Sequence, residues 1–325
     1  MSYKVGVVFG GNALQDEFFG GLEMKKEALS LLHNEGVRNI DTASGYAASE
    51  ENLGKLGAAK LYTLDTKFTG GSPDTPTKET IIATATESLK KTGAEQFDVY
   101  YIHAPDPRVP FEVAIDAINT LYQDGKILRF GLANFLPAQV EEVIRIAKEH
   151  NWITPTVYQG PYSAVARRSE SELFPILRKH GISFYAYSPI AGGFLAKDPA
   201  QLDLNDGGRW DSKTWVGNVF HMLYNKPSMR EGLKVWGDIA KESVLEKAEL
   251  AYRWNLYNSA LRGEYGDKII MGSNNVEQLR ETLGFLKKGP LSAEVVERIE
   301  GVWRIVEKDS PFDNFHDGIL KVIAH

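Results

Sequence analysis

The chain has 325 residues, of which 43% are hydrophobic and 25% are charged, and this composition is typical of a globular protein with a sizeable core. A formal charge of −6 gives it no basic footprint for nucleic acid. The absence of cysteine excludes disulfides, thiolate nucleophiles and cysteine-based zinc sites. The sequence has neither a secretory signal nor an apolar run of the about 20 residues that cross a bilayer, so we expect a cytoplasmic protein with no membrane partner.

Eight short apolar runs are predicted to be β-strands. Several of them, such as the run from Val99 to Ile102, are continuous rather than alternating, which is typical of parallel strands covered on both faces. In chain order the predicted strands are Lys4–Phe9, Asn39–Thr42, Leu61–Thr66, Phe97–His103, Ile127–Leu132, Thr154–Gln159, Ile182–Tyr187 and Lys268–Met271.

Between the strands, apolar residues recur at helical spacing, as in residues 24–32, 111–122 and 140–147. Four glycines follow helical stretches and suit the position after the last helical residue: Gly36, Gly93, Gly125 and Gly181. Eight strand–helix units in strict alternation predict a parallel α/β fold, and in about 290 residues they fit a closed (β/α)₈ TIM barrel better than an open sheet. We expect one domain that spans residues 1–325.

Two segments depart from this alternation. The segment from Gly192 to about Lys234 follows the seventh strand and is rich in glycine, aspartate, asparagine and aromatic residues, so we expect a long functional loop there. The stretch from Pro290 to His325 has a helical pattern around Val295–Val306 and then an irregular end, which predicts a C-terminal helical extension. The two standard glycine-rich phosphate-binding motifs do not occur in the sequence.

Side chains that can carry chemistry stand where the predicted strands end. Asp41 ends the second strand, Tyr46 follows in a glycine-containing loop, Lys67 comes at the end of the third strand and His103 ends the fourth. Each of them alone is more often a solvated or structural residue. Because a TIM barrel gathers its active site at the carboxyl ends of its strands, we expect the four to meet.

Together these four residue types suit the protonation of an oxyanion. A free tyrosine has a pKa of about 10 and is a poor acid at neutral pH, and a nearby lysine ammonium lowers that pKa. Asp41 can hold Lys67 in place and keep it charged, and His103 can orient a substrate oxygen. The set suits general acid catalysis after hydride attack on a carbonyl.

The sequence resembles the aldo-keto reductase superfamily over nearly its whole length. The residues that carry this resemblance are Asp41–Tyr46, Glu50–Gly54, Lys67, Asp98–His103, Gly125–Gly131, Asn134, Gln159, Tyr187–Pro189, Ile269–Asn274 and Glu277–Glu281. Three further motifs resemble the aflatoxin-aldehyde reductase subgroup: Tyr101–Asp106, Pro155–Gly160 and Phe184–Gly193.

The resemblance implies NADPH-dependent reduction of an aldehyde or ketone without a metal, with Tyr46 as the general acid assisted by Lys67, Asp41 and His103. It implies a small-molecule carbonyl compound as the substrate and favours a homodimer. The implied cofactor contacts are Asn134, Gln159 and Tyr187 at the nicotinamide, Ser188 at the pyrophosphate, Lys197 and Arg209 at the 2′-phosphate, and Asn274, Gln278 and Glu281 at the adenosine. Candidates for the wall of the substrate pocket are Phe9, Trp210, Trp215, Phe220 and Tyr224.

The chain departs from the family pattern at both the cofactor and the substrate positions. Ala133 stands in place of a serine, Thr282 in place of an asparagine and Gly272 in place of a phosphate-binding lysine. Where aflatoxin-aldehyde reductases carry arginines that suit carboxylated aldehydes, an ungapped alignment places Phe220 and Met222. We therefore expect an apolar or aromatic carbonyl substrate and poor turnover of succinic-semialdehyde-type compounds.

Two other functions are compatible with the predicted barrel. The first is an NADPH-binding regulatory module that resembles the potassium-channel β subunits. The second is a lyase or isomerase that uses Lys67 as a Schiff-base amine. Pairing with Asp41 disfavours the second, because a paired lysine stays protonated and is not nucleophilic.

Overall fold

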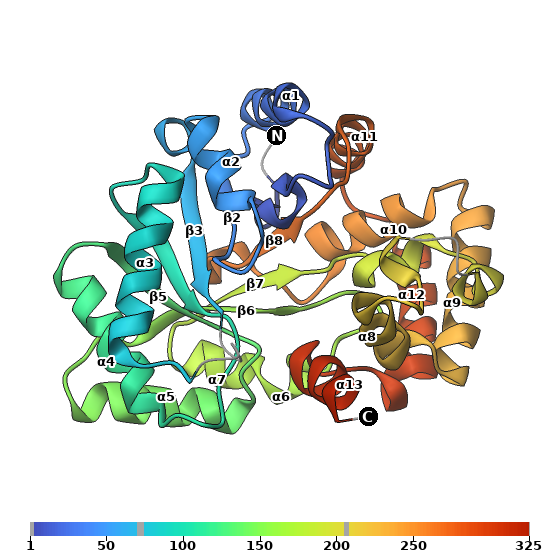
Figure 1. The fold of residues 1–325 in the computed structure, drawn as a ribbon. Helices are drawn as coiled ribbons and strands as arrows, with labels where there is room; N and C mark the ends of the chain where they lie inside the picture. Colours follow the sequence, from blue (N-terminus) through green and yellow to red (C-terminus); the bar gives the residue numbers. More distant parts are fainter. Residues whose placement is uncertain (1–2, 70–74, 205–207, 325) are drawn as a thin grey trace.

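Eight parallel strands form the centre of the structure, a computed structural model that describes residues 3–69, 75–204 and 208–324. Each strand pairs with the next one in the chain, and β8 pairs back with β1, so the sheet closes into a barrel (Figure 1). The expected (β/α)₈ TIM barrel is thus confirmed. The strands are β1 (Gly6–Gly10), β2 (Asn39–Asp41), β3 (Thr63–Phe68), β4 (Phe97–Ile102), β5 (Ile127–Ala133), β6 (Pro155–Pro161), β7 (Ser183–Tyr187) and β8 (Lys268–Met271).

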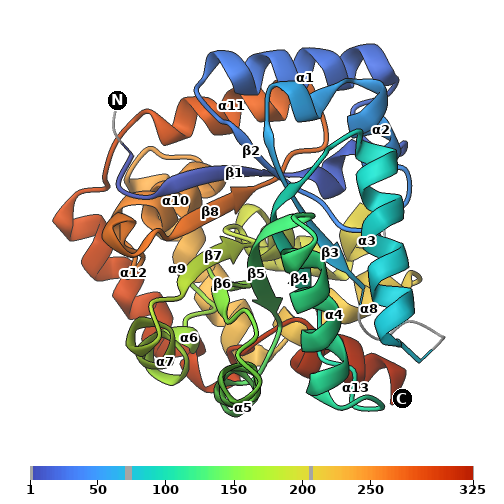
Figure 2. The ribbon, with the colours of Figure 1, turned by 90° about the vertical axis from the view of Figure 1, so that its left-hand side faces the viewer.

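Helices run along the outside of the barrel in the connections between strands (Figures 1 and 2). They include α1 (Leu22–Asn34), α2 (Ser49–Lys55), α3 (Lys78–Thr92), α4 (Phe111–Gln123), α5 (Pro137–Glu149), α6 (Ser169–Glu172), α7 (Phe174–Lys179), α10 (Lys247–Arg253) and α11 (Val276–Leu286). The glycines predicted to follow helices all have a positive φ, namely 81° for Gly36, 69° for Gly93, 67° for Gly125 and 67° for Gly181. Within the described ranges, none of the helices is long and apolar enough to cross a membrane.

The strand boundaries differ from the predicted ones by a few residues, and the difference matters for two site residues. Leu61 lies in a short turn, so β3 begins later than predicted and extends past Lys67. In the same way β6 extends past Gln159. Both residues therefore belong to hydrogen-bonded strands of the barrel, which hold their side chains more rigidly than a loop would.

The segment predicted to be a long loop after β7 is largely helical, so that prediction is wrong. It contains α8 (Trp215–Tyr224) and the start of α9 (Pro227–Glu242). Thr214 is the N-cap of α8 and accepts a hydrogen bond of 2.9 Å from the Gly217 amide, while Pro227 opens the first turn of α9. The glycines and asparagines of the segment lower helix propensity, but packing against neighbouring elements overrides that preference.

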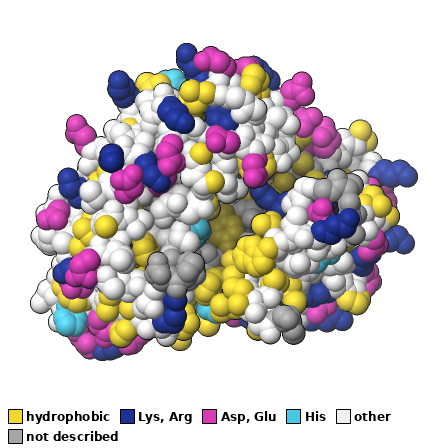
Figure 3. All heavy atoms as spheres, viewed as in Figure 1, with side chains coloured by type: hydrophobic (Ala, Val, Ile, Leu, Met, Phe, Trp, Pro, Cys, Tyr) yellow, Lys and Arg dark blue, Asp and Glu magenta, His cyan; other side chains and the backbone are white. Residues whose placement is uncertain are grey.

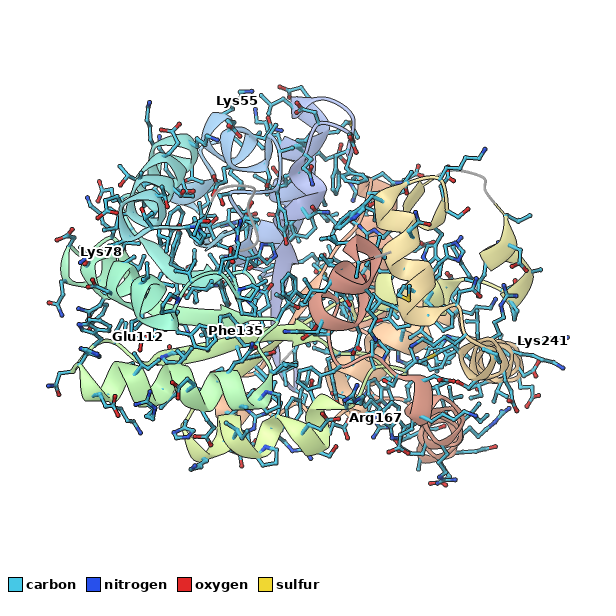
Figure 4. The ribbon with its side chains drawn as sticks, turned by 60° about the horizontal axis from the view of Figure 1, so that its bottom comes forward. Lys55, Lys78, Glu112, Phe135, Arg167 and Lys241 are labelled. Carbon is cyan, nitrogen blue, oxygen red and sulfur yellow. The ribbon has the colours of Figure 1, made fainter. Side chains whose placement is uncertain are left out.

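Arg167, in the connection between β6 and α6, fixes the C-terminal extension to the barrel (Figure 4). Its guanidinium lies 5.4 Å from the ring centroid of Trp303 and donates to Glu300 at 2.7 Å. Both partners belong to α12 (Ala293–Val306), which confirms the predicted helix in this region. The tail after it is more ordered than predicted, because it ends in α13 (Leu320–Ile323), which packs on α8.

A small apolar cluster fills the inside of the barrel and is separate from the layer between the barrel and its helices. Along β4, Val99 and Tyr101 belong to the interior cluster, whereas Tyr100 packs in the outer layer, as the alternation of a strand requires. Gly131 in β5 makes room for the Tyr101 ring, since a Cβ there would lie 2.3 Å from Cδ1 of that ring. The interior cluster also contains Val8, Val157, Tyr185 and Ile270.

A buried carboxyl group also lies inside the barrel. Asp65 in β3 is fully buried, and one of its oxygens accepts the Val99 amide at 3.1 Å. The other oxygen has no hydrogen-bond partner among the described residues. Burial, with the nearby charges of Asp98 and Asp41, raises the pKa of Asp65 to about 8. The group is therefore mostly protonated at neutral pH.

The raised pKa of Asp65 predicts a loss of stability at alkaline pH. Between about pH 4 and 8 the folded state keeps a proton that the unfolded state releases, so the free energy of unfolding falls as the pH rises through this window. Asp65→Asn keeps the shape without the charge, and at pH 9 it should raise the midpoint of thermal unfolding by about 3 °C or more. The increase should be much smaller at pH 5. An equal increase at both pH values would contradict the ionisation of Asp65.

Candidate active site

The loop after β2 carries Tyr46, and hydrogen bonds tie this loop to the end of β3. Ser44 donates its amide and its hydroxyl to the Lys67 carbonyl, at 3.1 and 2.9 Å. The Tyr46 amide donates to the Ala43 carbonyl at 3.0 Å, and the adjacent Ala47 has a φ of 36°, in the left-handed region. These contacts hold Tyr46 in a tight turn beside Lys67.

A buried ion pair joins β2 and β3. Nζ of Lys67 lies 2.5 Å from Oδ2 of Asp41, and the two side chains are only 0 and 4% exposed. Lys67 also donates to the Thr42 carbonyl at 2.7 Å, and the second Asp41 oxygen accepts from the Gln159 amide at 2.9 Å. Each charge thus has an opposite charge and further hydrogen bonds, which is the condition under which a buried ion pair is tolerated.

Tyr46 and His103 complete a group of four side chains. Nζ of Lys67 lies 5.2 Å from the centroid of the Tyr46 ring. The His103 and Tyr46 rings meet edge to face, with 5.7 Å between their centroids and 77° between their planes. The His103 amide extends the pairing of β4 by donating to the Phe68 carbonyl at 2.9 Å. The structure therefore brings together all four residues that were singled out at the predicted strand ends.

Burial and charge act in opposite directions on Tyr46 and Lys67. Burial raises the pKa of Tyr46, and the positive charge of Lys67 lowers it only in part. Burial lowers the pKa of Lys67, but the negative charge of Asp41 reverses this effect, so the pKa lies above that of a free lysine. The expectation of a tyrosine made more acidic by lysine is thus corrected, because desolvation outweighs the attraction. Tyr46 is a neutral phenol and Lys67 an ammonium at neutral pH.

His103 is neutral in the same environment. Desolvation and the positive charge of Lys67 lower the pKa of His103 to about 3. A neutral imidazole has one N–H to donate and one nitrogen that accepts. His103 can therefore hold and orient a ligand oxygen, but it is not a store of protons at neutral pH.

Two predicted cofactor residues are linked to His103 by hydrogen bonds. Asn134, directly after β5, has a φ of 58° and donates its side-chain amide to the His103 carbonyl at 2.9 Å. The Tyr187 hydroxyl, at the end of β7, donates to the side-chain carbonyl of Asn134 at 2.7 Å. An amide has two hydrogens and two acceptor lone pairs, so Asn134 keeps one of each for a ligand.

The backbone after Tyr187 bends through several left-handed conformations. Ser188 has a φ of 54°, Ala191 of 50°, Gly192 of 64° and Gly193 of 97°. Two amides of this bend are used within it, because Ala191 donates to the Ser188 carbonyl at 2.8 Å and Gly193 donates to the Ile190 carbonyl at 3.0 Å. The predicted pyrophosphate contact at Ser188 lies at the start of this bend.

The two predicted phosphate-binding cations lie in the segment after β7. Lys197 is half-buried and Arg209 is exposed, and neither forms an ion pair with a described carboxylate. The neighbouring acids Asp198 and Asp203 pair with other cations instead. Among the residues that the structure describes, neither cation is therefore neutralised by an acid.

Arg209 lies close to two tyrosines of the site. Its guanidinium is 5.7 Å from the centroid of the Phe220 ring and near enough to Tyr46 and Tyr252 for their charges to affect one another. Although the Arg209 side chain is exposed to solvent in part, desolvation by the protein around its guanidinium lowers its pKa, and the nearby Tyr252 and Tyr46 act in the opposite direction. Tyr252, in α10, was not predicted. Its hydroxyl donates to the Gly272 carbonyl at 3.2 Å, and no motif in the sequence points to it.

The three residues predicted at the adenosine end lie on α11 and just before it, and all three are exposed. The Asn274 amide donates to the side-chain oxygen of Gln278 at 2.7 Å, and the Gln278 amide donates to Asn275 at 2.8 Å. Glu281 is exposed on the same helix. Phe19 ties this region to the β1–α1 connection by donating its amide to the Asn274 carbonyl at 2.9 Å.

The aromatic side chains predicted to line the substrate pocket lie in different environments. Trp210, Phe220 and Tyr224 are buried and pack on one another, with 5.7 Å between the Trp210 and Phe220 centroids. The Phe220 ring lies on Gly192, where a Cβ would come within 1.9 Å of it. Trp215, in contrast, is 50% exposed at the start of α8.

Phe9 is not brought to this group. It is fully buried and meets Phe19 edge to face at 6.3 Å, in the layer between barrel and helices. Since side chains alternate along β1, Val8 faces the barrel interior and Phe9 faces outward.

The surface of the molecule is hollowed near the centre of the view in Figure 3, and hydrophobic side chains gather in this hollow.

Comparisons with known proteins agree with this architecture. A profile of the aldo/keto reductase family matches residues 7–304. The protein named Oxidoreductase sirO, from Leptosphaeria maculans, is 36% identical over 292 residues, which cover 89% of this chain and 88% of that protein. Aflatoxin B1 aldehyde reductase member 4, from Homo sapiens, is 34% identical over 294 residues, which cover 85% and 87% of the two chains. The resemblance seen in the sequence is confirmed.

The low pKa of His103 can be tested directly. In the wild-type protein the imidazole NMR signals of His103 should show no titration between pH 5 and 8, since the ring is already neutral. Lys67→Met removes one of the two causes and should move the titration of His103 upward. Signals of wild-type His103 that titrate near pH 6.5 would contradict the assignment.

Proposed function

The chain belongs to the aldo/keto reductase family, and from that membership we propose that it reduces an aldehyde or ketone to an alcohol with NADPH. It is an oxidoreductase, and members of the family act on small-molecule carbonyl compounds with a nicotinamide cofactor. The observation that carries the proposal is the convergence of Tyr46, Lys67, Asp41 and His103 at the carboxyl end of the barrel.

The residues around these four fit a nicotinamide cofactor. Tyr187 ends β7 with an aromatic ring, and Asn134 keeps a hydrogen and a lone pair for a ligand. When bound, the cofactor supplies the hydride that adds to the carbonyl carbon. The proposed contacts are Asn134 and Gln159 with the carboxamide, Tyr187 with the ring, Ser188 with the pyrophosphate, and Asn274, Gln278 and Glu281 with the adenosine.

Tyr46 is the proposed proton donor. Its O–H donates to the carbonyl oxygen and transfers the proton as the hydride reaches the carbon, so the oxygen ends as a hydroxyl and Tyr46 as a phenolate. The ammonium of Lys67 stabilises this phenolate, and Asp41 keeps Lys67 charged and in place. His103 donates its single N–H to the same oxygen and fixes its direction towards Tyr46.

The preference for NADPH rests on Lys197 and Arg209. Both lie without a described carboxylate partner, and an extra phosphate on the adenosine would supply the missing negative charge. Gly272 offers only backbone where relatives place a lysine, and the side chain of Thr282 hydrogen-bonds Tyr252. In this proposal the two cations of the β7–α8 segment replace the absent lysine.

The proposed substrate is an apolar or aromatic carbonyl compound. Support comes from the packing of Trp210, Phe220 and Tyr224 and from the hydrophobic side chains that gather in the hollow of Figure 3. A carboxylated aldehyde would meet Phe220 and Met222 at positions aligned with arginines of the aflatoxin-aldehyde reductases. Neither Phe220 nor Met222 can pair with a carboxylate, and the nearby Arg209 is assigned to the cofactor in this proposal, so such substrates should bind less well than apolar ones.

Tyr46→Phe removes the proposed proton donor with little change in shape. With 4-nitrobenzaldehyde and NADPH, we expect kcat to fall by about 100-fold or more, in line with the loss of general acid catalysis. The Kd for NADPH, measured by fluorescence titration, should change by less than about twofold, because no cofactor contact is assigned to the hydroxyl.

Tyr122→Phe, an exposed tyrosine on α4, is the matched control and should leave both constants unchanged. Wild-type kcat in the Tyr46 variant would refute the assignment of the acid. Tight binding of NADPH by the wild-type protein with no turnover of any carbonyl compound would favour the regulatory module instead.

Arg209→Gln tests the preference for the phosphorylated cofactor. We expect the KM for NADPH to rise about tenfold, the effect of losing one charge-assisted contact, while the KM for NADH changes little. Lys213→Gln, an exposed cation in the same segment, is the control and should leave both values unchanged. Equal losses with the two cofactors would mean that Arg209 binds the pyrophosphate that they share.

A further inference from the structure

A second cavity lies at the opposite end of the barrel from the proposed active site. It has a volume of about 400 Å³ and opens at the amino ends of β1, β2 and β8, which lie side by side (Figure 2). Three cationic side chains line it, those of Lys4, Arg38 and Lys268. These cations lie together in a chain whose formal net charge is −6.

The three cations of this cavity are bonded only to neutral oxygens. Nζ of Lys4 donates to the Ser259 carbonyl at 2.7 Å, and Arg38 donates to two backbone carbonyls at 2.5 and 3.2 Å. Nζ of Lys268 lies 3.3 Å from the side-chain oxygen of Asn39. Among the described residues, none of the three forms an ion pair with a carboxylate. Each keeps donors that a bound anion could use.

The acidic residues near the cavity do not neutralise it. Asp267 is paired with Arg178 at 2.6 Å, and Glu35 is paired with Lys287 at 2.5 Å. Glu264 is exposed at the edge and acts on Lys4 only through space. Desolvation and then the charge of Arg262 lower the pKa of Lys4, and the charges of Glu264 and Asp267 offset this effect only in part.

The inner end of the cavity is also short of negative charge. Lys268 extends over the Tyr185 ring, with Nζ 5.0 Å from the centroid, so it reaches the barrel interior. The charge of Lys268 acts on Asp65 in that interior, but burial keeps the pKa of Asp65 at about 8, so this carboxyl group is mostly protonated at neutral pH. Arg129 is also present there, but it is already neutralised by Asp98 at 2.7 Å. Lys268 therefore keeps an uncompensated charge.

Two glycines allow these cations to reach the cavity. A Cβ on Gly6 would lie 2.9 Å from Cγ of Lys268, so only a glycine lets the lysine cross the start of β1. A Cβ on Gly263 would lie 2.4 Å from the Lys4 carbonyl, so a glycine is needed there for the chain near Lys4 to pack closely. The backbone thus supports the placement of both lysines.

We propose that this cavity binds the phosphate group of a small anion, with Lys4, Arg38 and Lys268 as its ligands. A guanidinium fork and two ammonium groups form the donor set that recognises phosphate oxygens. The volume admits a phosphorylated metabolite as well as inorganic phosphate. The site is distinct from the proposed cofactor site, which lies at the other end of the strands, and the inference does not depend on it.

Isothermal titration of the full chain with inorganic phosphate and with glycerol 3-phosphate tests the site. We expect a Kd of about 1 mM or tighter that weakens with added salt, and tighter binding of the organic phosphate if a metabolite is the natural ligand. Arg38→Gln, at an exposed side chain, and Lys4→Gln should each weaken binding about tenfold. Glu264→Gln should strengthen it, because the change removes a nearby negative charge.

Two control variants separate this site from other cations of the chain. Lys90→Gln, at an exposed lysine of α3, should leave the Kd unchanged. Arg209→Gln is titrated as well, because Arg209 lies at the proposed cofactor site, where phosphate can also bind, and the binding assigned to Lys4 and Arg38 should persist in this variant. Phosphate binding that is lost in Arg209→Gln but kept in Arg38→Gln and Lys4→Gln would overturn the proposal. The same holds if neither phosphate binds, or if the variants at Lys4, Arg38 and Lys90 all weaken binding equally.

Discussion

The ion pair between Lys67 and Asp41 is the interaction on which the rest of the site depends. It lies almost out of contact with water, where an unpaired charge would be strongly destabilising, so each partner requires the other. Asp41 also binds the Gln159 amide, and the pair thereby connects β2, β3 and β6 across the mouth of the barrel. The loop of Tyr46 is attached to the Lys67 carbonyl through Ser44, so the backbone of the same lysine also positions the phenol.

The surroundings of this pair assign one protonation state to each neighbour. Lys67 is charged, and its charge together with desolvation keeps His103 neutral. Desolvation likewise keeps Tyr46 a phenol, although an ammonium lies beside its ring. A site with one cation, one anion, one neutral donor and one protonated acid at the same pH suits reduction of a carbonyl better than alcohol oxidation, which would begin from a phenolate. The low dielectric constant of the buried site, rather than any single contact, produces these different protonation states.

The sequence predicted the four central residues because a barrel brings together side chains that are distant along the chain but follow consecutive strands. It also predicted the glycines that follow helices, because a helix end of this kind requires a left-handed backbone conformation that glycine adopts easily. It failed for α8 and for Phe9, where the outcome depends on which neighbours a side chain packs against. The sequence could not predict the protonation state of Tyr46 either. Desolvation raises the pKa of Tyr46 and the charge of Lys67 lowers it, and only the three-dimensional structure shows which effect is larger.

The hydrogen bonds from Tyr187 to Asn134 and from Asn134 to His103 cross the site from β7 to β4. Asn134 holds a left-handed backbone conformation that is uncommon outside glycine, so it has little freedom to adjust by itself. Its amide donates to the backbone carbonyl of His103, and its side-chain oxygen accepts from Tyr187. These two hydrogen bonds therefore tie the aromatic end of β7 to the backbone at the end of β4 through a single side chain, so the positions of the two strand ends depend on Asn134.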